Sequence, residues 1–398
     1  MELDKLLYMA QKITLKSKKC LVILPYSNSG WQRFILKYLQ NIFEANSLQC
    51  DHISAQGDDQ NVVAEKIINL IADEKQPYDF IFTFNRVPAS RVILNDGLID
   101  LFSIASAPVV TWYIDNIGHH ISGLPEKISH QEVFLVADSC SIETGQKFDL
   151  PLSEKSFFPM WGPPAPENLE ISASRDIPVL FSGDLLKEES LENLKDRIVG
   201  KEDFARAIVD KTIERMVDKS GREDCFSILI SEITDRGFKK DAALSLFPSI
   251  DQWLRRRARL TNLRQFTSVP ITICGKIEDR EICSRPNVTI LGSRSVEEVT
   301  RIARRSRIFL GDFANFVSGV EIRPAMAFST GCVFACYENE FVEKNFPKSS
   351  YVGLACNNQN PESLIVDIIN DFDRLNCIGR NAARHYNAGL HDSLSFLE

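Results

Sequence analysis

The sequence lacks the local patterns that mark several common classes of protein. No apolar run approaches the roughly 18 residues of a membrane-spanning helix, so we expect no membrane span. The segment Met1–Lys5 carries acidic residues and leads into no uninterrupted apolar stretch, which argues against a secretory signal peptide. The ten cysteines include no C-x-x-C pair. We therefore expect reduced thiols and a cytoplasmic protein.

An excess of positive charge is also missing. Lys and Arg number 46 against 54 Asp and Glu, which gives a formal net charge of -8. This balance argues against a protein that coats nucleic acid. The 398 residues are 44% hydrophobic, so the chain is long and apolar enough for two or three domains with a sizeable core.

Short apolar runs alternate with helical patterns along most of the chain. Runs of this length suit parallel strands that are buried on both faces. We expect strands at residues 20–25, 78–84, 108–114 and 132–137, and then at 177–181, 270–275, 288–292, 308–310 and 332–335. Strands that alternate with helices predict an α/β fold with two doubly wound, Rossmann-like halves.

A proline-rich segment separates the two halves. Residues 158–166 contain four prolines, which neither a helix nor a central strand accommodates. We therefore expect domains at residues 1–165 and 166–375, with a helical insertion at 185–266 and a C-terminal helix at 376–398 that packs back on the N-terminal domain. Ligands of such sheets bind beyond the carboxyl ends of the strands, which predicts a cleft between two facing domains.

Polar residues follow the strands of the first half. Asn28, Ser29 and Gly30 follow the first strand and precede a helix, so they are candidates to contact a phosphate or a sugar hydroxyl. Asn85 and Arg86 follow another strand. Neither the G-x-G-x-x-G fingerprint nor a P-loop is present, and an ordinary turn is the alternative in both places.

A third loop, after the strand at 108–114, carries an acid, an amide and two histidines. Asp115 is a candidate general base toward a hydroxyl nucleophile, and His119 or His120 is an alternative. Asn116 lies between them. Two adjacent histidines do not make a zinc motif, and a capping Asp with solvent-facing histidines is the structural alternative.

The richest segment is residues 311–332. Gly319 permits close approach of the backbone, Glu321 is a candidate to accept from the hydroxyls of a ribose, and Arg323 is a candidate to neutralise a pyrophosphate.

Together these motifs resemble the GT-B glycosyltransferases, and more narrowly their spore-protein CgeB-like group. The matches are Trp112–Asn116 to a W-[YF]-x-D-N element, Phe181-Ser182-Gly183 to an F-x-G strand end, the block Asn315, Gly319, Arg323, Gly331 and Cys332, and, loosely, Arg380–Ala383 with His391. Ile117 departs from the usual proline. Ser329 stands where many retaining enzymes have the second acid of an E-x7-E pair, so the stereochemical class stays open.

The resemblance implies a bacterial glycosyltransferase with a nucleotide-sugar donor and a glycan or protein acceptor, and no cofactor or metal. It places donor contacts at Ser182, Gly183, Gly275, Asn315, Gly319, Glu321 and Arg323, and catalysis at Asp115 and His119. The sequence also has no D-x-D triplet at a strand end. An inactive scaffold, or an epimerase or binding protein for nucleotide sugars, is the alternative.

A run of arginines lies in the expected insertion, from Arg255 to Arg259, with Arg264 nearby. A solvated helix face is the plain interpretation. The alternative is a contact with an anionic acceptor, an acidic protein or the surface of a membrane.

Overall fold

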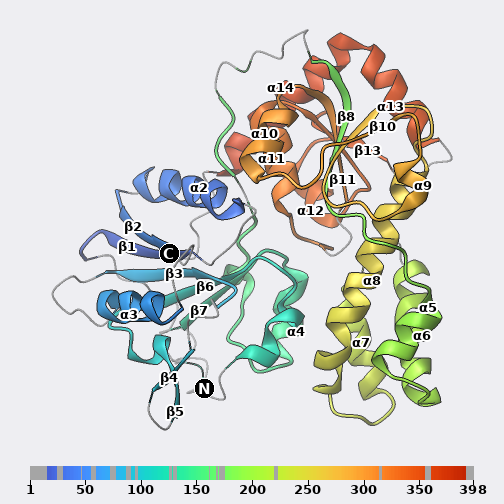
Figure 1. Cartoon of the computed structure of the whole chain (residues 1–398). Coiled ribbons are helices and arrows are strands. Elements are labelled where there is room, and N and C mark those ends of the chain that lie inside the picture. Colours follow the sequence, from blue (N-terminus) through green and yellow to red (C-terminus); the bar gives the residue numbers. More distant parts are fainter. Residues whose placement is uncertain are drawn as a thin grey trace. The chain divides into compact units, whose positions relative to one another are not determined.

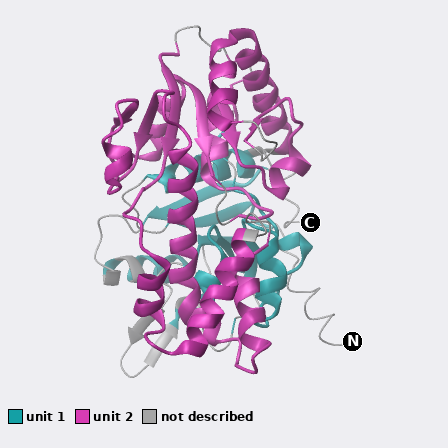
Figure 2. Ribbon diagram, turned by 90° about the vertical axis from the view of Figure 1, so that its right-hand side faces the viewer, with its two compact units in different colours: residues 1–163, 390–398 teal, residues 164–389 magenta. Residues whose placement is uncertain are grey.

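A computed structural model of the chain forms two compact units. They comprise residues 1–163 with 390–398, and residues 164–389 (Figures 1 and 2). The division lies two residues before the expected boundary at 165. The structure describes residues 16–24, 30–45, 47–54, 60–71, 78–86, 91–94, 97–124, 128, 132–160, 162–166, 169, 175–218, 223–312, 316–354 and 360–390.

The first unit is built on a five-stranded parallel sheet in the order β2-β1-β3-β6-β7. Its strands are β1 (Lys19–Leu24), β2 (Gln49–Ser54), β3 (Phe80–Phe84), β6 (Val109–Tyr113) and β7 (Glu132–Val136). Helices α2 (Trp31–Ala45), α3 (Gln60–Ile71) and α4 (Cys140–Gln146) lie between or after the strands, and β4 (Arg91–Leu94) and β5 (Gly97–Asp100) form a separate antiparallel pair. The sheet order reverses between β1 and β3.

Aromatic side chains fill one side of this sheet. Trp112 is fully buried, and its ring packs 4.9 Å from Phe158 and 6.1 Å from Phe82, measured between ring centroids. The indole nitrogen of Trp112 donates to the Phe158 carbonyl at 2.9 Å. Burial of large rings is the main stabilising term in such a core, and the hydrogen bond satisfies the one polar atom of the indole.

The second unit contains a six-stranded parallel sheet in the order β10-β9-β8-β11-β12-β13. The strands are β8 (Ile177–Ser182), β9 (Ile271–Cys274), β10 (Val288–Ile290), β11 (Ser306–Gly311), β12 (Val333–Cys336) and β13 (Val352–Gly353). Helices α9 (Arg280–Cys283), α10 (Val296–Ala303), α11 (Ile322–Thr330), α12 (Glu340–Asn345) and α13 (Pro361–Asn370) connect or follow them. The chain builds one side of the sheet from β8 and then returns to β11, so the order reverses between these two neighbours.

Four helices lie between β8 and β9, where the sequence predicted an insertion. They are α5 (Leu191–Ile198), α6 (Asp203–Asp218), α7 (Cys225–Thr234) and α8 (Ala242–Arg264). The rings of Phe226 and Phe247 pack against one another in the helical part, with their centroids 4.7 Å apart. Leu260 and Leu263, at the other end of α8, are buried in the core of the sheet. Helix α8 therefore joins the insertion rigidly to the sheet.

The C-terminal helix α14 (Phe372–Leu390) packs within the second unit. Leu375 and Ile378 belong to the core of its sheet, and the ring of Tyr386 lies 5.9 Å from that of Phe328. The side chain of Asn387 exchanges two hydrogen bonds with the backbone of Ala165. The buried side chains of the helix thus face the second sheet, and its packing on the N-terminal domain stays a prediction. Within the described residues, no helix combines the length and apolar character needed to cross a membrane.

Candidate functional site

The second unit gathers polar residues where its strand order reverses. Strands β8 and β11 are neighbours in register, with Leu310 opposite Phe181. Gly183 follows β8 and Asp312 follows β11, so both lie at the carboxyl edge of the sheet. Parallel sheets bind ligands in the crevice at this position, because the loops on either side of it diverge.

Two arginines and two acids form a linked group at this edge. Arg323, in the first turn of α11, pairs with Glu321 at 2.5 Å and with Asp312 at 3.5 Å. Arg259 of α8 donates to Asp312 at 3.1 Å. We call Gly183, Arg259, Asp312, Glu321 and Arg323 the switch-point cluster. Sequence analysis predicted three of these residues for the donor site and missed Arg259 and Asp312.

The pKa of Glu321 reflects this environment. Burial raises the pKa of the Glu321 carboxyl above its ordinary value, while the Arg323 guanidinium works in the opposite direction. The neighbouring carboxylates raise the pKa of Arg323 against the effect of its burial, so the guanidinium stays charged. A carboxyl in this setting can accept hydrogen bonds from hydroxyl groups, and the arginines supply positive charge beside it.

Two predicted glycines allow the backbone to pass close to this cluster. Gly183 has a φ of +155°, and a Cβ there would lie 3.1 Å from a guanidinium nitrogen of Arg323. A Cβ on Gly275, just after β9, would lie 2.2 Å from the carbonyl oxygen of Gly183. A side chain at Gly275 would displace the backbone of the β8 end, whereas one at Gly183 would adopt a strained backbone conformation and press on the Arg323 guanidinium. Ser182, the last residue of β8, lies half-buried next to them.

The loop before α11 is held by an asparagine that sequence analysis missed. Asn339 donates to the carbonyls of Gly319 at 2.8 Å and Phe316 at 2.9 Å, and its side-chain oxygen accepts from Val342 at the start of α12. The hydrogen bond from Asn339 holds the backbone of Gly319, which is buried and lies two residues before Glu321. The predicted donor residue Asn315 lies outside the described residues.

A second polar group lies in the first unit, after β3 and β6. The side chain of Asn85 donates to a carboxylate oxygen of Asp115 at 3.1 Å and accepts from the amide of Ile114 at 2.9 Å. Nε2 of His120 lies 3.9 Å from the same carboxylate, and 45% of the Asp115 side chain is exposed. Asp115 is thus oriented by a neighbour and open to solvent.

The environment of His120 keeps its ring neutral. Burial lowers the pKa of His120 to about 4, although the charge of Asp115 acts to raise it. The ring also packs 5.3 Å from that of Tyr113. Of the two histidines, it is His120 whose ring nitrogen lies near the Asp115 carboxylate. The predicted catalytic residue His119 is half-buried on the adjacent short helix, with its ring centroid 6.4 Å from that of His120.

Arg86 is held by two acids. Its guanidinium is buried and pairs with Glu132 at 2.7 Å and with Asp100 at 2.8 Å. Its contact with a phosphate or an acceptor stays a prediction.

Asn116 is buried as well, and its side chain accepts from the amide of Gly118 at 3.0 Å, so it caps a short helix. Gly30, with a φ of +74°, forms the turn into α2. Asn28 and Ser29 lie outside the described residues.

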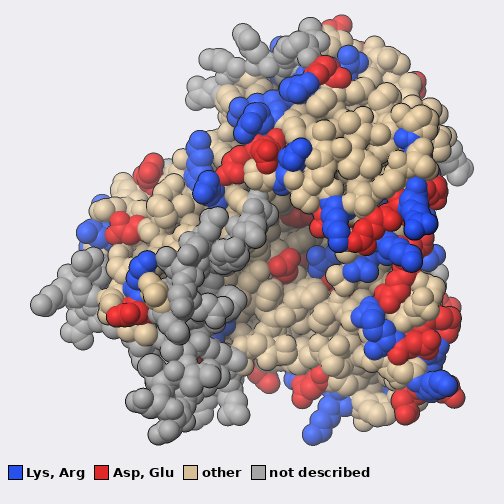
Figure 3. Space-filling model, viewed as in Figure 1, with Lys and Arg blue, Asp and Glu red and all other residues tan. Residues whose placement is uncertain are grey.

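Three arginines of α8 pair with acids, and for two of them the acids come from other elements. Arg255 pairs with Asp251, Arg259 with Asp312, and Arg264 with Glu188 and Asp279. Arg257 lies over the ring of Trp253. Figure 3 accordingly shows basic and acidic side chains interspersed over the helical insertion. A contact of Arg255–Arg259 with a membrane or an acidic partner stays a prediction, beside the plain interpretation of a solvated helix face.

Among the residues that the structure describes, no three His, Cys, Asp or Glu side chains lie together in a way that could hold a metal ion.

No family model matches this chain, and no curated protein is similar to it in sequence. Among solved structures, it is similar to HepE of Anabaena in complex with UDP and glucose, with a TM-score of 0.47 at 10% identity over 95% of this chain and 99% of that one. It is similar to AviGT4, a glycosyltransferase involved in avilamycin A biosynthesis, with a TM-score of 0.47 at 9% identity over 95% and 96% of the two chains. A third such structure is sucrose-phosphate synthase from Thermosynechococcus elongatus, with a TM-score of 0.48 at 8% identity over 95% and 96%.

Proposed function

We propose that the protein is a glycosyltransferase that transfers a sugar from a nucleotide-sugar donor to a hydroxyl of a glycan or protein, without a metal ion. The observation that carries the proposal is the switch-point cluster. In it Gly183 and Arg323, which match the family motifs, lie beside Glu321 at the edge of a doubly wound sheet where such sheets bind their ligands.

On the donor side, each residue has a role suited to its chemistry. Glu321 accepts hydrogen bonds from the two ribose hydroxyls, and Arg323 and Arg259 stabilise the diphosphate as it leaves. Their charge offsets the leaving group where other transferases use a metal ion. Gly183 lets the diphosphate approach the backbone at the end of β8.

On the acceptor side, Asp115 is the proposed base. Asn85 holds one carboxylate oxygen, so the carboxylate keeps its orientation while it takes the proton of the attacking hydroxyl. His120, neutral beside it, adds no positive charge that would weaken the base.

A nucleotide titration tests the donor site. UDP, GDP and dTDP are titrated into the wild-type protein and into Gly183→Ala by calorimetry. We expect one nucleotide to bind, and the Gly183→Ala variant to bind it at least about tenfold more weakly, because the new methyl group displaces Arg323. Truncating Arg323 itself would leave the Glu321 carboxyl without its ion-pair partner and risk unfolding, so the glycine is the better position.

Gly237→Ala is the matched control. Gly237 also has a positive φ, +81°, but no atom lies within 4 Å of its would-be Cβ. Both variants carry the backbone cost of about 1 kcal/mol, and only one touches the cluster. The proposal that the switch-point cluster binds the donor is overturned if no nucleotide binds the wild type, or if the two variants bind it equally well.

The catalytic role of Asp115 is tested on the wild-type protein and Asp115→Asn. With nucleotide sugars and a panel of acceptors, we expect the variant to lose at least about a hundredfold in transfer rate while it keeps its affinity for the nucleotide. Excess EDTA should leave the wild-type rate unchanged. An unaltered rate in Asp115→Asn would remove Asp115 from the base role, and loss of activity in EDTA would overturn metal independence.

A further inference from the structure

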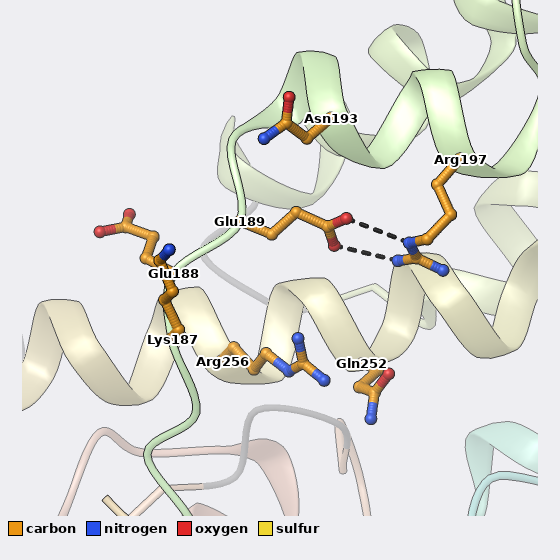
Figure 4. Close-up of a pocket in the computed structure, with 7 residues that line it drawn as sticks. All are labelled: Lys187, Glu188, Glu189, Asn193, Arg197, Gln252 and Arg256. Atoms are coloured by element: carbon orange, nitrogen blue, oxygen red, sulfur yellow. Dashed lines mark hydrogen bonds and ion pairs between the residues drawn. The ribbon is translucent and has the colours of Figure 1, made fainter. Parts of the chain in front are cut away.

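A pocket of about 500 Å³ opens in the helical insertion, between the segment after β8 and helices α5 and α8. Its lining is polar or charged throughout and consists of Lys187, Glu188, Glu189, Asn193, Arg197, Gln252 and Arg256 (Figure 4). None of these residues belongs to the switch-point cluster, and the proposed transfer reaction uses none of them.

Both acids of the pocket already have partners. Arg197 donates to the two carboxylate oxygens of Glu189, at 3.0 Å each, and this bidentate pair lowers the pKa of Glu189. Arg264 pairs with Glu188 at 2.9 Å. The Glu189 backbone is fixed too, because the indole of Trp253 donates to its carbonyl at 2.7 Å. The acidic wall of the pocket is thus neutralised and preformed.

Two cations remain without such a partner. The side chains of Lys187 and Arg256 form no ion pair with any residue in the described part of the chain, and Nε of Arg256 is buried with no hydrogen-bond acceptor. Arg256 lies close enough for its charge to lower the pKa values of Glu189 and Glu278. A buried guanidinium nitrogen without an acceptor costs free energy, which a bound anion would recover.

Helical spacing adds amide donors to these cations. Gln252 and Arg256 stand four residues apart on α8, as do Asn193 and Arg197 on α5, so each pair shares one helix face. Figure 4 shows the two pairs on opposite sides of the Glu189 carboxylate. The guanidinium of Arg256 and the amine of Lys187 supply the positive charge, and the amides supply neutral donors, that a carboxylate or phosphate group in this pocket would need.

The pocket is separate from the switch-point cluster but close to it. Arg256 is three residues before Arg259 on α8, which is less than one helical turn, and Arg259 contacts Asp312 of the cluster. Arg256 therefore adds a second point of positive charge beside the one that the proposed donor site uses.

We propose that this pocket binds the anionic group, carboxylate or phosphate, of a ligand other than the nucleotide. The inference is independent of the proposed function, since the pocket and its two unpaired cations are present whatever reaction the protein performs.

Calorimetry on the full chain tests the site with inorganic phosphate, D-glucuronate and neutral D-glucose as probes. We expect phosphate or glucuronate to bind, and the probe that binds more tightly identifies the class of anion. Glucose should give no heat. Saturation with the nucleotide that binds most tightly should leave anion affinity unchanged, because the two sites are distinct.

Substitutions locate the binding. Arg256→Gln and Lys187→Gln should each weaken the anion at least about tenfold, and Arg256→Lys, which keeps the charge but not the planar fork, should fall between them and the wild type. The matched controls are Arg280→Gln and Lys239→Gln, which remove exposed charges outside the pocket. Circular dichroism confirms that each variant is folded. The proposal is overturned if neither anion binds the wild type, if Arg256→Gln binds it as tightly as Arg280→Gln does, or if the nucleotide displaces it.

Discussion

At the scale of single residues, the pKa of His120 gives the clearest test of the first unit. Burial lowers it to about 4 from the ordinary 6.5. Between these values the unfolded chain binds a proton at this position and the folded chain does not. The contribution of neutral His120 to the free energy of unfolding is therefore fully present above pH 6.5 and is lost as the pH drops toward 4. At about 1.4 kcal/mol per pH unit, the loss by pH 5 is up to about 2 kcal/mol.

Urea unfolding at pH 7 and pH 5 measures this loss. We expect His120→Gln to lose about 2 kcal/mol less than the wild type between the two pH values. His52→Gln, at an exposed position on edge strand β2, should behave like the wild type. Titration of the histidine Cε1 signals by NMR reports the pKa directly. A His120 signal that titrates near 6.5 would contradict the burial described here.

Nothing in the sequence indicates that Asp115 and Arg86 have different surroundings in the fold. Both follow a buried strand, and both looked like ligand contacts in the sequence. Their partners in the fold differ. Glu132, 46 residues away, pairs with Arg86, whereas only a neutral amide, Asn85, orients Asp115. Because such pairing arises when distant segments meet, single-sequence analysis cannot detect it.

At the scale of elements, apolar runs predicted the central strands of both parallel sheets and the edge strands β7 and β10, but not the edge strands β2 and β13. Strands β3 and β6 are buried along their whole length, so nearly every residue in them is apolar. Strand β2 reads Gln-Cys-Asp-His-Ile-Ser, because as an edge strand it is only partly covered. It has no apolar run, and we missed it. The β4 and β5 pair, four residues each, was missed as well.

The loop before α11 depends on an element that follows it in sequence. We expect Asn339→Ala to lower the free energy of unfolding by about 2–4 kcal/mol, since it leaves two buried carbonyls unpaired and removes the cap of α12. Nucleotide affinity should fall with it, because Gly319 and Glu321 lose their fixed position. Urea unfolding and calorimetry measure the two effects.

Asn345→Ala is the control for this variant. Asn345 is exposed, and its side chain makes one hydrogen bond, to the Phe341 carbonyl in its own helix. Its replacement should cost less than about 0.5 kcal/mol. Equal losses for the two variants would show that Asn339 does not hold the loop.

At the scale of the whole molecule, the net charge of -8 conceals local pairing. The basic run of α8 looked unbalanced because acids are sparse nearby in the sequence. Its partners Glu188, Asp279 and Asp312 come from segments that flank α8 in the fold. The strand order, which reverses between β8 and β11, could not be predicted either. The sequence indicates where strands lie but not which strands are neighbours in the sheet.

The second unit is expected to fold by itself. It contains all six strands of its sheet, and the hydrophobic cluster around this sheet consists of residues between Val179 and Ile378. We therefore expect a fragment of residues 164–390 to unfold in one cooperative urea transition and to bind the same nucleotide as the full chain. A second fragment that begins at residue 175 lacks the two hydrogen bonds between Ala165 and Asn387, so it should be less stable by about 1–2 kcal/mol. Non-cooperative unfolding of the longer fragment would show that this sheet needs the first unit to fold. A folded fragment that binds no nucleotide would show that the switch-point cluster is insufficient for donor binding.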